Sequence, residues 1–273
     1  MSSIKRIAAG VALIFIFLFA TWALVRTHAQ VKQGDPGSGP TPVLVELFTS
    51  EGCSTCPPAD ALLVRLTEQP IYGNVQMITL EEHVDYWDAQ GWVDPYSSRD
   101  WTSRQRDYSG VLKNGNPYTP QMVVDGAKEF VGSHAQEARQ AIIEAGGKTK
   151  IPVTLRLTGA NGERAESFHV QVGKLEGTAK RDTAEVWLAI TETGLHTAVT
   201  RGENAGADLH HAAVVRSMRK IGEAKGDGEF SFTGDTSAPL RSEWKRENLR
   251  AVLFVQERKS RRILGAAEIH ISG

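Results

Sequence analysis

Both cysteines of this chain lie in one short stretch, residues 43–66. Val43 to Phe48 are mostly aliphatic, β-branched or aromatic, which suits a buried strand. Cys53 and Cys56 follow a glycine-containing turn, and apolar residues then recur at helical spacing. Pro57 falls in the first turn of this helix, where a missing N–H is tolerated. The stretch therefore predicts a strand, a turn and a helix whose first turn carries a dithiol.

The position of the dithiol has a chemical consequence. A sulfur at a helix N-terminus lies near unpaired N–H groups and the positive end of the helix dipole. Both features stabilise a thiolate, which is the nucleophile in thiol–disulfide exchange. We expect Cys53 to be the more exposed sulfur and assign it the attacking role. Cys56, one turn further on, then resolves the mixed disulfide.

Two structural roles stay open beside this redox role. A structural disulfide would close a very small ring, which removes little chain entropy, roughly 2 kcal/mol. A structural zinc site usually takes four cysteines, or three with one histidine, and the sequence offers no cysteine beyond these two. The spacing therefore favours a redox-active CxxC disulfide.

The N-terminus has the composition of an export signal. Lys5 and Arg6 precede a run from Ile7 to Val25 without a charged residue, and Thr27-His28-Ala29 offers a cleavage site. The run also approaches the ~20 residues that span a bilayer. Residues 1–29 are therefore either a cleaved signal peptide or a retained transmembrane anchor, and both place the rest of the chain outside the cytoplasm.

We accordingly expect a periplasmic or secreted protein, or one that residues 7–25 anchor in the inner membrane. Residues 30–42 are rich in glycine and proline and are expected to form a linker.

Several long motifs resemble those of the DUF1223 family, whose members are secreted, thioredoxin-like proteins of unassigned activity. These motifs are Leu44–Asp60, His83–Asp88, Gly91–Pro95, Tyr118–Gly126 and Arg201–Gly206. The resemblance covers nearly everything after the N-terminal segment and implies a thioredoxin-like fold. It also implies that the Thr119–Pro120 bond is cis, that Pro120 packs against the dithiol, and that the backbone of Thr119 pairs with bound substrate.

The order of elements in the first half agrees with that resemblance. Residues 75–80 read as a second strand that a helix separates from the first, so the two should be parallel. Residues 121–124 and 128–131 read as a hairpin around an Asp-Gly turn, and a helix should run from Ser133 to Ala145.

We therefore predict an α/β thioredoxin-like domain over residues 43–149, with residues 83–112 as an insertion. Residues 150–273 contain short alternating segments between turn residues, which predict an all-β sandwich domain.

Three histidines are candidates for further site residues. His83 follows the second strand, at the edge of the sheet where functional loops gather, and is a candidate proton shuttle or ligand. The more ordinary role of such a residue is to cap a helix or to hydrogen-bond a loop. His210 and His211 are adjacent, so in a strand they face opposite ways and make a poor joint metal site. We therefore name no metal site from the sequence.

The charge balance excludes several classes of protein. Of 273 residues, 31 are Lys or Arg and 32 are Asp or Glu, which leaves no overall field to attract nucleic acid. The sequence has no phosphate-binding loop, dinucleotide fingerprint or nucleic-acid-binding signature. We expect neither a cofactor nor a nucleic-acid partner.

The first functional hypothesis is an extracytoplasmic thiol–disulfide oxidoreductase, with Cys53 and Cys56 catalytic and Thr119 and Pro120 binding substrate. Its partners would be protein thiols or disulfides and a redox partner in the membrane. One alternative is a copper-binding protein or metallochaperone of the cell envelope that uses both thiolates and His83. Another is a non-catalytic envelope interaction protein with an inert disulfide, which burial of both sulfurs would favour.

Overall fold

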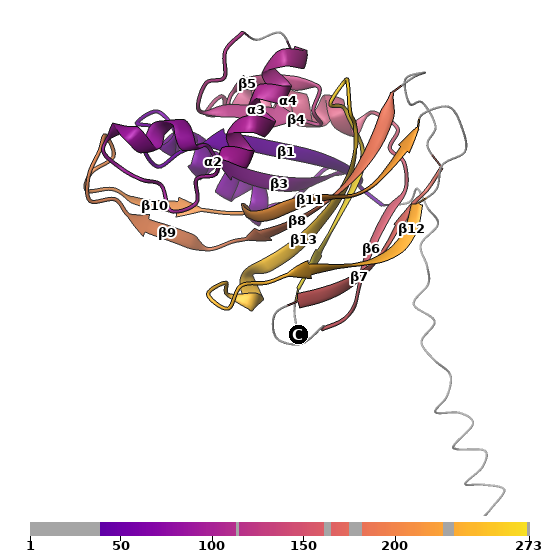
Figure 1. The fold of residues 1–273 in the computed structure, drawn as a ribbon. Coiled ribbons are helices and arrows are strands. Elements are labelled where there is room, and N and C mark those ends of the chain that lie inside the picture. Colours follow the sequence, from indigo (N-terminus) through magenta and orange to yellow (C-terminus); the bar gives the residue numbers. More distant parts are fainter. Residues whose placement is uncertain (1–38, 113–114, 161–164, 175–181, 226–231, 272–273) are drawn as a thin grey trace, which may run out of the picture. The chain divides into compact units, whose positions relative to one another are not determined.

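The strand that precedes the cysteines lies inside a large mixed sheet (Figure 1). The computed structural model describes residues 39–112, 115–160, 165–174, 182–225 and 232–271. The predicted signal or anchor over residues 1–29 and the linker up to residue 38 lie outside the described residues. Within the described ranges, no helix has both the length and the apolar character needed to cross a bilayer.

The first half of the described chain alternates strands and helices. Its elements are β1 (Thr41–Thr49), α2 (Pro57–Glu68), β2 (Ile71–Tyr72), β3 (Val75–His83), the 3-10 helix η1 (Asp85–Gln90), α3 (Arg99–Leu112), β4 (Gln121–Val124), β5 (Lys128–Val131) and α4 (Ala135–Gly146).

The second half is built almost entirely of strands. Its elements are β6 (Val153–Ala160), β7 (Ala165–Val172), β8 (Thr183–Glu192), β9 (Leu195–Ala198), β10 (Asp208–His211), β11 (Val214–Lys225), β12 (Phe232–Pro239), the 3-10 helix η2 (Arg246–Asn248), β13 (Leu249–Glu257) and β14 (Ile263–His270).

Strands from both halves join in one sheet. Among the described residues, this sheet has nine strands in the order β14-β13-β8-β11-β3-β1-β4-β5, with β2 paired to β3. β1 and β3 are parallel, as predicted, and β4 pairs antiparallel to β1. Two smaller sheets complete the described fold, β12-β7-β6 and β10-β9.

Successive side chains of β1 point to opposite faces of the large sheet, and different helices cover these two faces. Val43, Val45 and Leu47 pack with apolar residues of α2 and α4 in one buried cluster. Leu44 joins a second cluster on the opposite face that includes Trp101 of α3. α2 and α4 therefore cover one face near the cysteines and α3 covers the other (Figure 1).

The three-stranded sheet packs on the C-terminal strands of the large one. Val186 and Leu188 of β8 share a buried cluster with Phe168 and Val170 of β7. The two sheets therefore pack face to face, and the apolar side chains on their facing sides form a core between them.

The predicted fold class, a thioredoxin-like α/β domain followed by an all-β sandwich domain, is wrong. The described chain is mostly β-sheet, and β8, β11, β13 and β14 extend the sheet that contains β1 and β3. The joint is local: Val214 of β11 pairs with Glu81 of β3, and the N–H of Glu81 donates to the carbonyl of Ala213 at 2.9 Å. Alternation in a sequence identifies a strand and its buried face but not its neighbour in space, which is why the sequence could not predict this joint.

Candidate functional site

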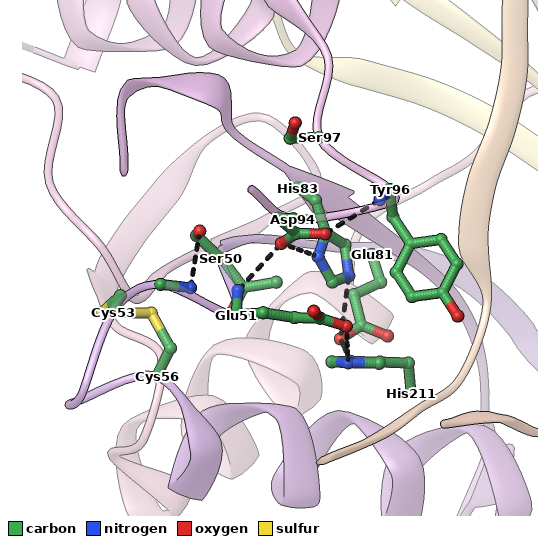
Figure 2. A network of polar contacts seen from close by, with 12 residues as sticks. Ser50, Glu51, Cys53, Cys56, Glu81, His83, Asp94, Tyr96, Ser97 and His211 are labelled. Carbon is green, nitrogen blue, oxygen red and sulfur yellow. Dashed lines mark hydrogen bonds and ion pairs between the residues drawn. A yellow bond between two sulfur atoms is a disulfide. The ribbon is translucent and has the colours of Figure 1, made fainter. Parts of the chain in front are cut away.

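The two cysteines form a disulfide at the start of α2 (Figure 2). Their Cα atoms lie 5.4 Å apart, within the ordinary range for a disulfide. β1 ends at Thr49, and the chain then turns so that the N–H of Cys53 donates to the carbonyl of Ser50 at 3.1 Å. Cys56 is the N-cap residue of α2, whose first helical position is Pro57. The predicted order of strand, turn, dithiol and helix is confirmed.

The first turn of α2 offers the sulfurs fewer donors than the sequence suggests. Pro57 and Pro58 have no N–H, and the N–H groups of Ala59 and Asp60 both donate to the carbonyl of Cys56, at 2.8 and 3.2 Å. The first four residues of the helix therefore leave no free backbone N–H for a thiolate. A side chain offers one instead, because the hydroxyl of Thr55 lies 3.4 Å from the Sγ of Cys53.

The expectation that Cys53 is the more exposed cysteine is wrong, because both cysteines are 0% exposed. A loop far along the chain lies against them. The side-chain amide of Asn204 donates to the carbonyls of Glu51, at 2.8 Å, and Cys53, at 3.0 Å. Glu203 accepts a hydrogen bond from the N–H of Ser54 at 3.2 Å.

We call residues 201–206 the cover loop. The loop packs closely against Trp92 because residue 202 is glycine. A Cβ built on Gly202, whose φ is +78°, would lie 3.0 Å from the Cβ of Trp92. Of the residues between the cysteines, Ser54 and Thr55 stay exposed. The tip of the CxxC turn therefore reaches the surface, whereas both cysteines are buried and the cover loop is bound to the backbone of the turn.

Thr119 and Pro120 lie near the same turn. The Thr119–Pro120 peptide bond is cis, as predicted. The indole N–H of Trp87 donates to the hydroxyl of Thr119 at 2.8 Å, and a Cβ built on Gly52 would lie 3.1 Å from the Cβ of Trp87. Trp87 therefore bridges the turn before Cys53 and the cis bond. Pro120 is buried and Thr119 is half-buried.

Beside the disulfide lies a buried polar cluster of Glu51, Glu81, His83, Asp94 and His211, each no more than 2% exposed (Figure 2). The Nδ1 of His83 lies 2.7 Å from the Oδ2 of Asp94, and its Nε2 lies 3.6 Å from the Oε1 of Glu81. The Nδ1 of His211 lies 2.9 Å from the Oε1 of Glu81, and its Nε2 lies 3.2 Å from the Oε1 of Glu51. We call these five residues the polar cluster.

The backbone ties the polar cluster to the cysteine turn. The N–H of Glu51, two residues before Cys53, donates to the Oδ2 of Asp94 at 2.8 Å. The Oε2 of Glu51, the carboxylate oxygen that does not face His211, accepts a hydrogen bond from the indole N–H of Trp92 at 2.8 Å. One side chain of the polar cluster therefore belongs to the CxxC turn itself.

The acidic and basic groups of the polar cluster shift each other's pKa values. Burial lowers the pKa of His83, but the carboxylates of Asp94 and Glu81 outweigh burial and hold this pKa well above 6.5. Burial likewise lowers the pKa of His211, and Glu81 with Glu51 raises it to about 9. Burial raises the pKa of Asp94 and of Glu81, but the neighbouring histidines reverse both shifts. The described side chains thus balance buried carboxylates with two imidazolium ions.

Asp60 on α2 adds a further buried carboxyl group. The hydroxyl of Thr49 donates to its Oδ1 at 2.6 Å, and no described group hydrogen-bonds its Oδ2. Burial, with the nearby charge of Glu81, raises the pKa of Asp60 to about 7. This carboxyl group can therefore change its protonation near neutral pH.

His83 serves the polar cluster and not the sulfurs. Its two ring nitrogens face Asp94 and Glu81, and within the described part of the chain the residues with metal-ligand spacing are Glu81, His83 and His211, without a cysteine. The arrangement that a copper site of two thiolates and His83 requires is therefore not formed in the oxidised protein.

Sequence reasoning missed His211, Glu51, Glu81 and Asp94. His210 and His211 do face opposite ways, with His210 exposed and His211 buried. The partners of His211 come from β3 and from the CxxC turn, so no local pattern could identify them. The sequence signals were the run Glu81-Glu82-His83, polar residues where a buried strand ends, and the family motifs Leu44–Asp60 and Gly91–Pro95, which contain Glu51 and Asp94.

The described fold has relatives among solved structures. Protein AGR_C_4864 of Agrobacterium tumefaciens is similar with a TM-score of 0.62 and 23% identity, over 85% of this chain and 96% of that chain. HBP35 of Porphyromonas gingivalis is similar with a TM-score of 0.60 and 16% identity, over 86% of this chain and 76% of that chain. At these identities the likeness concerns the fold alone. No curated protein matches the sequence.

The family model described as "protein of unknown function (DUF1223)" matches residues 44–256, which include the cysteines, the cis bond, the polar cluster and the cover loop. The chain therefore belongs to the DUF1223 family.

Proposed function

We propose that this chain is an extracytoplasmic thiol–disulfide oxidoreductase that exchanges its Cys53–Cys56 disulfide with protein thiols or disulfides. The observation that carries the proposal is the disulfide itself, closed across a short turn at the start of α2 with Ser54 and Thr55 exposed between the cysteines. A turn this short adds little stability as a crosslink, roughly 2 kcal/mol, so a chemical role explains it better.

The exchange uses both sulfurs in turn. In the reduced protein, the Cys53 thiolate attacks a substrate disulfide, which forms a mixed disulfide and releases one substrate thiolate. The Cys56 thiolate then attacks the Sγ of Cys53, which releases the second substrate thiolate and re-forms the Cys53–Cys56 bond. Two electrons pass from this dithiol to the substrate, and the reverse sequence oxidises a substrate dithiol. Thr119 and Pro120, joined to the cysteine turn through Trp87, are the proposed contacts for the substrate backbone.

Because both cysteines are buried, substrate access requires a local movement, and we propose that the cover loop provides it. Asn204 holds the backbone of Glu51 and Cys53 by two hydrogen bonds, and Glu203 holds Ser54 by a third. Hydrogen bonds of this kind contribute about 1 kcal/mol each, so displacing a few of them is compatible with turnover.

The proposed location is the periplasm or the exterior, with residues 7–25 as export signal or inner-membrane anchor. The charged start and the uncharged apolar run support this location. An oxidising compartment suits a stable disulfide, and a membrane redox partner would restore the working redox state.

The test is equilibration of the native protein with mixtures of reduced and oxidised glutathione, followed by thiol counting, with insulin reduction as a catalytic assay. We expect reversible reduction of the disulfide without unfolding and accelerated insulin reduction, both lost in Cys53→Ala. Insulin reduction by Cys53→Ala at the wild-type rate would contradict the proposal.

One observation favours a second candidate function, a non-catalytic interaction protein with an inert disulfide: both cysteines are fully buried. The two functions differ in one result. An inert disulfide resists glutathione until denaturant unfolds the chain, whereas an exchanging disulfide is reduced while the circular dichroism spectrum stays native.

A further inference from the structure

Three residues of the polar cluster are arranged as the ligands of a metal ion. Glu81 and His83 come from the end of β3 and His211 from the end of β10. One ligand atom from each lies within 4.8 Å of the other two, and all three side chains are buried. We propose that Glu81, His83 and His211 bind one divalent transition-metal ion of the zinc class, at a site distinct from the disulfide.

The spacing of the donor atoms fits such an ion. Nitrogen and oxygen ligands lie about 2.0–2.1 Å from zinc, so two ligands of a tetrahedral site are about 3.4 Å apart. The Oε1 of Glu81 lies 3.6 Å from the Nε2 of His83 and 2.9 Å from the Nδ1 of His211. The two distances bracket the required value, and the three ligand atoms all lie within 4.8 Å of one another.

One of the three ligand atoms makes no hydrogen bond to a described group. The Nε2 of His83 is fully buried, and no described group hydrogen-bonds it. Its nearest carboxylate oxygen, on Glu81, is at 3.6 Å, beyond hydrogen-bond distance. An unsatisfied buried nitrogen costs free energy, and a metal ion at this atom would remove that cost.

The opposite ring nitrogens are held as in known metal sites. A histidine that binds a metal usually places its other nitrogen against a carboxylate, which fixes the ring and its tautomer. The Nδ1 of His83 meets Asp94 at 2.7 Å, and the Nε2 of His211 meets Glu51 at 3.2 Å. Both rings therefore have a carboxylate on the far side and Glu81 on the near side (Figure 2).

The charge of the polar cluster is also compatible with a cation. Glu51, Glu81 and Asp94 are three buried acidic side chains. Without a metal, two imidazolium ions compensate them, and a single divalent ion carries the same charge as those two protons while both imidazoles stay neutral. Two imidazoles and one carboxylate form a ligand set that zinc commonly takes, whereas Cu(I) prefers sulfur ligands and Ca²⁺ takes six to eight oxygen ligands.

The bound ion would crosslink two segments that are far apart in the sequence. β3 meets the second half through the hydrogen bond from Glu81 N–H to Ala213, and the Oε2 of Glu81 accepts the N–H of Ala212 at 2.9 Å. A metal bound by Glu81 and His211 crosslinks the same joint. We therefore expect metal binding to raise the melting temperature.

The test uses the full chain with its disulfide intact, so that no thiolate competes for the metal. His196 and His210 are exposed near Asp208, and both are changed to alanine to remove adventitious surface binding. This parent is dialysed against a chelator and titrated with Co²⁺ and then Zn²⁺. We expect about one equivalent to bind, with the visible absorption of four- or five-coordinate Co²⁺, displacement by Zn²⁺, and a rise in melting temperature.

Variants of the parent locate the site. His83→Ala and Glu81→Gln should each weaken Zn²⁺ binding by about a hundredfold or more, and Asp94→Asn should weaken it about ten- to a hundredfold. His134→Ala, which changes an exposed histidine on the loop before α4, is the matched control and should bind as the parent does. Equal affinity of the parent and a folded His83→Ala variant, or no binding by the parent, would overturn the proposal.

A further measurement, on the wild-type chain, tests the site even if the variants fail to fold. X-ray absorption of the Zn²⁺-loaded wild-type chain should show nitrogen and oxygen ligands only, with the multiple scattering of imidazole. A sulfur shell, or the absence of imidazole scattering, would contradict the site. Neither result depends on whether the disulfide exchanges, so the metal site and the proposed redox function can fail separately.

Discussion

At the scale of single residues, the neighbours of Cys53 decide how reactive its sulfur is. Two prolines and two paired N–H groups leave the start of α2 without a free backbone donor. Thr55, exposed and one residue before Cys56, instead places its hydroxyl 3.4 Å from the Sγ of Cys53. The helix dipole and this hydroxyl are the features that remain to favour a thiolate.

Thr55→Val removes the hydroxyl and keeps the shape of the side chain. In the reduced protein we expect the Cys53 thiolate to lose a hydrogen bond of about 1.5 kcal/mol, which lowers its alkylation rate by iodoacetamide at pH 7 about tenfold. Ser54→Ala, which changes the exposed neighbour, is the control and should leave the rate unchanged. A Thr55→Val rate equal to that of wild type would show that the hydroxyl does not stabilise the thiolate.

Asp125 provides a test of buried charge away from the site. Its Oδ1 accepts the N–H of Leu44 at 3.1 Å, and Lys150 donates to its Oδ2. Burial raises the pKa of Asp125 above 3.8, although Lys150 opposes that shift. A raised pKa in the folded state means that the native protein holds this proton more tightly than the unfolded chain. The stabilising contribution is therefore complete below pH 3.8 and is lost as pH rises through the folded-state pKa.

Asp125→Asn isolates this effect, since asparagine imitates the protonated acid and tolerates the positive φ of 52° at this position. We expect the free energy of unfolding of wild type, relative to that of the variant, to fall as pH increases from 3 towards 7, measured by urea unfolding. A relative gain by wild type over this range would mean that the attraction to Lys150 outweighs burial.

At the scale of elements, the cover loop links the second half of the chain to the CxxC turn. Its residues Glu203 and Asn204 bind the backbone of Glu51, Cys53 and Ser54. We expect the loop to control access to the disulfide. Its conformation rests on Gly202 and on Gly91, each with positive φ and close to the other.

Asn204→Ala removes two of the three hydrogen bonds that hold the cover loop. We expect native-state reduction of the disulfide by dithiothreitol to accelerate about three- to thirtyfold, since each hydrogen bond contributes about 1 kcal/mol. Asn74→Ala, at the exposed turn that precedes β3, is the matched control and should reduce at the wild-type rate. An unchanged rate in Asn204→Ala would mean that the loop does not limit access.

At the scale of the whole molecule, α3 joins strands of both halves through Arg104. Its guanidinium pairs with Glu46 of β1 at 2.6 Å and donates to the Oε1 of Gln256 of β13 at 3.1 Å. Glu82 of β3 lies 3.3 Å from the same group. Because this buried cation contacts three strands of one continuous sheet, the described chain should unfold cooperatively.

Arg104→Met should therefore destabilise the protein by about 3–5 kcal/mol, because it leaves buried carboxylates unpaired. The exposed Arg106→Met on the same helix should change stability by less than about 0.5 kcal/mol. In urea, fluorescence and circular dichroism should report one coincident transition for wild type. Two separated transitions would instead indicate that the halves of the chain unfold as independent domains.

The local elements of the site could be predicted from the sequence, and their assembly could not. The strand before Cys53, the helix at Pro57, the strand at 121–124 and the cis bond at Pro120 follow from short patterns or from the family motifs. The joint at Glu81 and Val214 is one backbone pair between segments more than a hundred residues apart. His211 reaches Glu51 and Glu81 only because of that joint, so no window of sequence contains the polar cluster.

If Cys53 is the attacking sulfur, it forms a mixed disulfide with a protein substrate, and this species can be trapped. Cys56→Ser keeps the attacking sulfur and removes the resolving one, so the variant should accumulate a covalent complex with an unfolded disulfide-containing protein. Mass spectrometry should place the bond on Cys53, and dithiothreitol should release the partner. If Cys56→Ser forms no such complex while its fold is native, the disulfide is not an exchange site and the redox function proposed here is contradicted.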